Sequence, residues 1–84
     1  MDRNNQQSIL EIKDISVAAY LYSTNLLRFI GKRRLTTGAV MFQFSPKMKA
    51  EELINSYWSL SAPPIQPKLL FSAQRDLKDM IFGG

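Results

Sequence analysis

The candidates for acid–base chemistry in this 84-residue sequence are its seven carboxylates, because it contains neither histidine nor cysteine. Glu51 and Glu52 are adjacent, so on a helix they would diverge by about 100° and could not act as a pair. Asp76 and Asp79 share a helix face, but basic residues alternate with them. That pattern is typical of a solvated helix face with local ion pairs rather than of a catalytic dyad.

The remaining catalytic arrangements have little support in the sequence. Serine and threonine lack a histidine partner, and the sequence neither supports nor excludes a serine–lysine arrangement. Gly31 and Gly38 are isolated, so no glycine-rich phosphate loop exists. Disulfides and thiolate metal sites are impossible without cysteine. We therefore predict that the protein is not an enzyme and that it uses no cofactor or metal, and no small-molecule ligand is evident.

The positive charge of the chain is concentrated in its middle third. Residues 15–50 hold six lysine or arginine side chains and no carboxylate, whereas the net charge of the whole chain is +4. Four of these cations could contact the phosphate oxygens of a nucleic acid: Arg28, Lys32, Arg33 and Arg34. The competing interpretation is that they protect an exposed strand edge from pairing with other chains. We favour edge protection and keep a nucleic-acid-binding accessory protein as the alternative function.

These cations lie in a region where the hydrophobic period is two. Apolar side chains alternate with others from Leu26 onward, and a second alternating run contains Val40, Phe42 and Phe44. Two such runs joined by a short loop with Gly38 predict an antiparallel β-hairpin. The alternation predicts that the phenylalanines, Phe29 included, face the core and that the arginines face water.

The outward face of this hairpin is predicted to be half apolar, with Ile30 on one strand and Ala39 and Met41 on the other. Either another segment covers this face or the face associates with a partner. The leading functional hypothesis is therefore a small non-enzymatic protein-interaction module. Its partner is an unknown protein or a second copy bound through the hairpin, which would give a dimer.

Helical patterns flank the hairpin on both sides. Asp14 is a predicted N-cap for a helix over residues 15–24, which Asn25 ends in a left-handed conformation. The predicted buried face of this helix comprises Ile15, Ala18, Ala19 and Tyr22.

Two more helices follow the hairpin. Ser45 is the predicted N-cap of the next one, and Pro46 its first residue. That helix is predicted to bury Ala50, Leu53, Ile54, Tyr57 and Trp58. The last helix starts at Pro67 and buries Leu70, Ala73, Leu77, Met80 and Ile81.

Together these elements predict an α+β fold: a helix, a two-stranded antiparallel β-hairpin, then two helices packed on one face of the hairpin. Residues 14–84 would form one small domain after a flexible or loosely docked N-terminal segment, residues 1–13. Whether residues 9–13 form a strand or a loop stays open. The polar first residues, the lack of a long apolar run and the absence of cysteine predict a cytoplasmic protein without membrane contact.

The hydrophobic landmarks of the chain support a family resemblance. They are Tyr20-Leu21-Tyr22, Leu27 to Phe29, Glu51-Glu52-Leu53-Ile54 with Tyr57-Trp58, a proline loop, and Leu70-Phe71 followed by Ala73 and Leu77-Lys78. Over about residues 14–82 they resemble a family of short bacterial and phage domains of unknown function. The resemblance implies a compact α+β domain of bacterial or viral origin, and it supplies no functional residues.

The predicted buried and exposed positions should differ in their effect on the free energy of unfolding. Truncating a buried leucine, as in Leu53→Ala, should cost about 2–5 kcal/mol of unfolding free energy. Arg34→Ala, on the predicted water side, should change it by less than about 0.5 kcal/mol.

Overall fold

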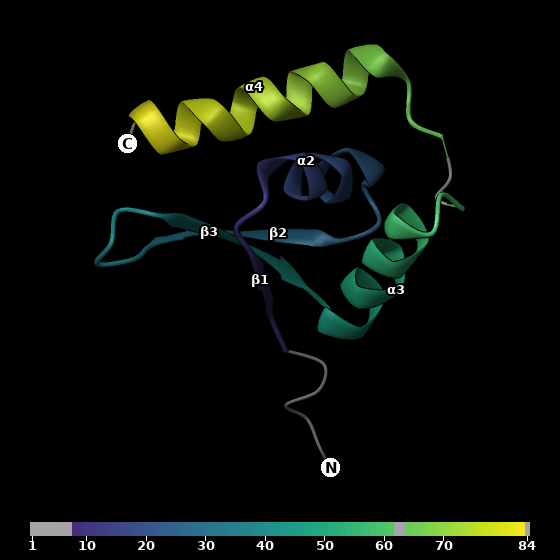
Figure 1. The fold of residues 1–84 in the computed structure, drawn as a ribbon, viewed down its shortest axis with the longest axis horizontal. Coiled ribbons are helices and arrows are strands. Elements are labelled where there is room, and N and C mark those ends of the chain that lie inside the picture. The colour runs from purple at the N-terminus through teal and green to yellow at the C-terminus, as the bar shows by residue number, and fades with distance from the viewer. Residues whose placement is uncertain (1–7, 62–63, 84) are drawn as a thin grey trace.

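The computed structural model describes residues 8–61 and 64–83 of the chain, and these residues form an α+β fold. Figure 1 labels its three strands and three helices. In chain order they are β1 (Leu10–Ile12), α2 (Ile15–Thr24), β2 (Arg28–Arg34), β3 (Val40–Ser45), α3 (Lys47–Trp58) and α4 (Pro67–Gly83).

Within the described residues the sheet has three strands rather than the predicted two. Its order is β1-β3-β2, and both neighbouring pairs are antiparallel. Leu10 pairs with Phe44 and Ile12 with Phe42, so the segment left open between strand and loop is an edge strand. An alternating pattern of three residues is too short to identify a strand from sequence. Strand β1 is therefore recognisable only from its pairing with β3.

The predicted β-hairpin of β2 and β3 is confirmed. Its loop is closed by the Leu35 amide, which donates to the Ala39 carbonyl at 2.7 Å, and by the Gly38 amide, which donates to the Leu35 carbonyl at 2.9 Å. Gly38 has φ +95°, a conformation that favours glycine.

The helices do not cover the sheet in the predicted way. Figure 1 shows α2 lying against the sheet and α4 lying across the far side of α2. The prediction placed the last two helices on the hairpin, whereas α4 packs on α2 and α3 packs against α2 and β3. The physical reason is the composition of α2, in which five consecutive residues from Val17 to Leu21 are buried. A helix that is apolar all round takes neighbours on two sides.

The ends of α2 are as predicted. The Asp14 carboxylate accepts hydrogen bonds from the Ser16 amide at 2.8 Å and from the Val17 amide at 3.3 Å. Asn25 ends the helix with φ 60° and ψ 18°, a left-handed conformation that asparagine tolerates. The cap and the stop fix where the chain enters and leaves the central layer.

The start of α3 differs from the prediction. Ser45 is the last residue of β3 and is buried, and Pro46 occupies the N-cap position after a cis peptide bond, with no side-chain capping hydrogen bond. Leu53 is buried as expected, but Trp58 is 64% exposed, because the helix ends at this residue. The predicted capping serine and the predicted burial of Trp58 are therefore wrong.

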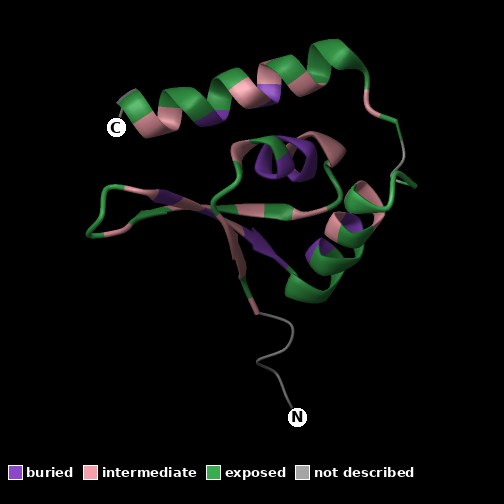
Figure 2. Cartoon of the chain, viewed as in Figure 1, coloured by how far each residue is buried: buried purple, intermediate pink, exposed green. Residues whose placement is uncertain are grey.

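The core lies between the sheet, α2 and the inner face of α4. Figure 2 shows buried residues running through β3 and α2. The largest fully buried side chains are Phe42, Phe44, Leu21, Leu77 and Val17. The inward orientation of the phenylalanines is confirmed for Phe42 and Phe44, and Phe29 packs on Phe44 with ring centroids 5.4 Å apart.

Candidate functional site

A β-bulge interrupts the basic strand β2. Phe29 pairs with Phe44, but the next pair along β3 joins Gly31 to Gln43, so Ile30 is an extra residue. Gly31 has φ +152°, a conformation rarely adopted by L-residues, and this glycine lets the strand accommodate the insertion. The strict alternation predicted for β2 therefore fails after Phe29.

The bulge changes the side of the sheet on which the following cations lie. Lys32 pairs with the buried Phe42, and Arg34 pairs with the buried Val40. Residues paired across neighbouring strands share a face. Lys32 and Arg34 therefore emerge on the helix-covered side, whereas the strict alternation predicted from Phe29 would place both on the opposite side.

On that side the two cations meet the C-terminal end of α4. The Lys32 ammonium donates a hydrogen bond to the Met80 carbonyl, and Arg34 donates through Nη2 to the Ile81 carbonyl at 2.8 Å. Both carbonyls belong to the last turn of α4, where intrahelical partners run out. Positive charge is also favourable at the negative end of a helix dipole. Lys32 and Arg34 thus cap α4 and attach it to the sheet.

Arg33 lies on the opposite side of the sheet, in a polar cluster that crosses all three strands. Its Nε and Nη2 donate to the two oxygens of Glu11 at 2.8 and 2.7 Å, and the Gln43 amide donates to the same carboxylate at 2.8 Å. We call Glu11, Gln43 and Arg33 the Glu11 ladder. The hydrogen bonds from Arg33 and then Gln43 lower the pKa of Glu11 from 4.5 to about 2, and Glu11 raises the pKa of Arg33.

The structure therefore divides the predicted nucleic-acid set. Lys32 and Arg34 hold α4 on one side of the sheet, and Arg33 is paired with Glu11 on the other. Arg28 is the member of the set whose side chain has no hydrogen bond or ion pair to any residue in the described ranges. Because a phosphate would have to compete with these internal partners, the cluster is a weaker anion site than its sequence indicates. Nucleic-acid contact stays a prediction.

The predicted protein-interface residues are only partly accessible. Ile30 is 43% exposed at the bulge, whereas Ala39 and Met41 are half-buried. Met41 pairs with Arg33, so the Glu11 ladder borders the apolar part of this face. The bulge and the charges of β2 also make its free edge a poor template for pairing. The hairpin thus offers a small and mainly polar surface.

Sequence reasoning missed the surface with the most exposed aromatic side chains, on the outside of α4. Phe71 is 66% exposed and Phe82 is 84% exposed. With Arg75 and Lys78 between them they follow the spacing i, i+4, i+7 and i+11, which places all four on one helix face. We call Phe71, Arg75, Lys78 and Phe82 the outer stripe. The same spacing is readable in the sequence, but spacing alone does not show that this face of the helix has no neighbour.

The cations of the outer stripe are unpaired within the described part of the chain. The side chains of Arg75 and Lys78 have no hydrogen bond or ion pair there, and the same holds for the side chain of Lys68, one turn before Phe71. Asp79 stands four residues after Arg75 without forming an ion pair with it. The outer stripe therefore combines exposed aromatic rings with positive charge that is free to meet a partner.

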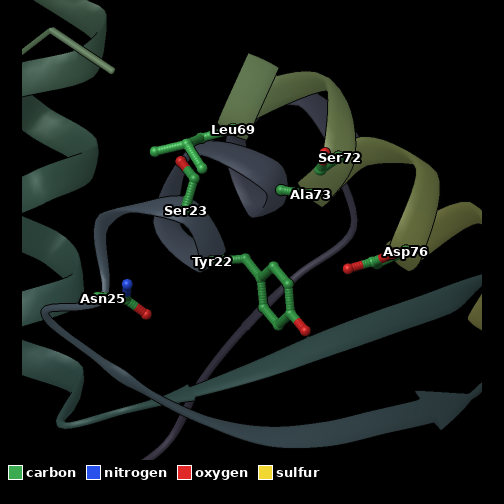
Figure 3. Close-up of a pocket in the computed structure, with 7 residues that line it drawn as sticks. All are labelled: Tyr22, Ser23, Asn25, Leu69, Ser72, Ala73 and Asp76. Carbon is green, nitrogen blue, oxygen red and sulfur yellow. The ribbon is translucent and has the colours of Figure 1, made fainter. Parts of the chain in front are cut away.

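A pocket of about 190 Å³ lies where the end of α2 meets the beginning of α4 (Figure 3). Its lining comprises Tyr22, Ser23, Asn25, Leu69, Ser72, Ala73 and Asp76. Asp76 is the single carboxylate of the lining, and no base or second acid faces it there. Across residues 8–61 and 64–83, no group of three potential metal ligands is present. The pocket can hydrogen-bond a small polar solute but provides no acid–base pair.

Among the described residues, Tyr20 is the one buried titratable side chain outside these surfaces. Its hydroxyl is enclosed without a hydrogen-bond partner in the described ranges, and burial raises its pKa. The ring packs on Tyr57 with centroids 5.2 Å apart. Since no base contacts the hydroxyl, Tyr20 acts as a core aromatic residue.

Comparison of the chain with protein families, curated proteins and solved structures finds no match. The resemblance to bacterial and phage domains therefore stays a prediction. In the described ranges no helix has both the length and the apolar composition needed to cross a bilayer.

Proposed function

We propose that this chain is a small non-enzymatic module that binds another protein through the outer stripe of α4. The exposure of Phe71 and Phe82, on the face opposite the buried Ala73 and Leu77, carries the proposal. Aromatic residues and arginine are enriched in protein interfaces, where aromatic anchors supply much of the binding energy. An exposed helix face is also a recurring surface for binding a second helix.

The placement of α4 supports this proposal because the helix is held at two points. Leu77 is fully buried against the core, and the last turn is capped by Lys32 and Arg34. A side chain on a fixed helix loses less conformational freedom on binding than one on a mobile loop. The cations of β2 therefore serve the interaction indirectly, by fixing the helix that presents the stripe.

Selection from a displayed random-peptide library tests the proposal. Peptides enriched on the wild-type protein should bind a Phe71→Ala/Phe82→Ala variant at least about tenfold more weakly, as loss of an aromatic anchor implies. Met48→Ala is the matched control, because Met48 is exposed on α3, away from the stripe. Absence of any enriched peptide, or equal affinity for the double variant, would contradict the proposal.

Self-association through Ile30, Ala39 and Met41 is a second candidate, favoured by the exposure of Ile30 at the bulge. Sedimentation equilibrium at tens of micromolar tests it with an Ile30→Glu variant. If the wild type is a dimer and this substitution dissociates it, the binding surface is the hairpin rather than the outer stripe. A monomer would remove self-association through the hairpin and leave the outer stripe as the candidate surface.

A further inference from the structure

We infer that the partner of the outer stripe is an acidic amphipathic helix of a different protein, an inference that depends on the function proposed above. Arg75 and Lys78 occupy the middle of the stripe between two aromatic anchors. A partner that covers Phe71 and Phe82 must also take both cations out of water. Buried charge is unfavourable unless an opposite charge meets it. The partner must therefore place carboxylates at the centre of the contact.

The spacing of the stripe specifies where those carboxylates stand. Phe71 and Phe82 are separated by 11 residues, or about 16 Å along the helix axis. A facing helix matches this pattern with apolar residues at i and i+11 and with Asp or Glu at i+4 and i+7. The intervals 4, 3 and 4 read the same in both directions, so the motif is identical for a parallel and an antiparallel partner.

The same symmetry disfavours a second copy of this chain as the partner. In a two-fold antiparallel pair of α4 helices, Phe71 would face the Phe82 of the other copy, and Arg75 would face its Lys78. Two like-charged pairs at the centre of a contact are repulsive. The stripe is complementary to an acidic helix and not to itself.

A single-stranded nucleic acid fits the surface less well than an acidic helix. Binders of single strands follow the backbone with a charged groove and stack bases on exposed aromatic rings. The outer stripe lies on one face of a single helix, and its cations are Arg75 and Lys78, with Lys68 one turn before Phe71. Three phosphate contacts would give weak and strongly salt-dependent binding. Packing against a second helix uses both the rings and the charges.

A displayed library of single helices, randomised at positions i, i+4, i+7 and i+11, provides the test. We expect selection on the wild-type protein to enrich Asp or Glu at the two central positions and apolar residues at the outer ones. Against an Arg75→Glu/Lys78→Glu variant, the enriched central residues should change to Lys or Arg. A peptide with central Glu should bind this variant at least about tenfold more weakly than it binds the wild-type protein. The corresponding peptide with central Lys should bind the variant more tightly than it binds the wild type. Such a reversal would not follow from a merely structural role of the two cations.

Different results separate this inference from the proposed function. Enrichment of apolar or neutral central residues, with binding still lost in the Phe71→Ala/Phe82→Ala variant, would overturn the acidic partner and keep the binding module. Binding independent of both phenylalanines would overturn both. Self-association abolished by Phe82→Ala, or retardation of an oligo(dT) probe abolished by Arg75→Glu/Lys78→Glu, would assign the stripe to another occupant and overturn the inference. Circular dichroism of each variant confirms that the fold is retained.

Discussion

The strand β2 and the helix α4 use lysine and arginine for different purposes. In β2, Lys32 and Arg34 bond to helix carbonyls and Arg33 pairs with a carboxylate. In α4, Arg75 and Lys78 have no such partner in the described ranges. The cations that are more closely spaced in the sequence, those of β2, are thus less available for binding a partner. Local charge density alone does not locate a binding surface, because internal partners decide which cations remain free.

The largest expected change in the free energy of unfolding distinguishes the inner face of α4 from its outer face. Leu77→Ala should lower the free energy of unfolding by about 2–5 kcal/mol, because Leu77 is fully buried. Phe82→Ala should change it by less than about 0.5 kcal/mol, because Phe82 is 84% exposed. Urea denaturation measures both. A comparable loss in the two variants would mean that the outer stripe is needed for folding.

The next effect concerns the cations that cap α4. Lys32→Met with Arg34→Met should cost about 1–2 kcal/mol, because both remove charged donors from otherwise unpaired helix carbonyls. This expectation replaces the near-silent Arg34→Ala that the sequence predicted. Arg28→Met is the control and should stay within about 0.5 kcal/mol. Hydrogen exchange should accelerate selectively in the last turn of α4. Uniform acceleration, or none, would contradict the capping role.

The bond from Arg34 to the end of α4 illustrates which parts of the fold the sequence determines. Asp14, Asn25 and Gly38 act through neighbouring residues, so their cap, stop and turn are readable locally. The bulge at Ile30 depends on the pairing of β2 with β3, and a one-residue insertion reverses the facing of everything after it. The outer stripe was readable as a helical repeat, but its freedom from internal partners was visible only in three dimensions.

The third effect appears in the pH dependence of the Glu11 ladder. The pKa of Glu11 falls from 4.5 to about 2 in the folded state, so its contribution to stability is present above about pH 4.5. That contribution is lost as the pH falls from 4.5 toward 2. A Glu11→Gln variant should therefore lose less stability than the wild type in this window. Urea denaturation measures the free energy of unfolding of both proteins between about pH 5 and 2.5. If the two pH profiles are parallel, protonation of Glu11 is not coupled to folding.

The smallest expected effect is the one that most sharpens the contrast between β2 and α4. Arg75→Gln with Lys78→Gln should change the free energy of unfolding by less than about 0.5 kcal/mol, because these side chains form no hydrogen bond or ion pair in the described structure. The pair is matched to the capping pair in number and in charge removed. If the fold depends on Lys32 and Arg34 but not on Arg75 and Lys78, the first pair is structural and the second is available for binding. A loss as large as that of the capping pair would make the cations of α4 structural too and would leave its phenylalanines without a charged centre.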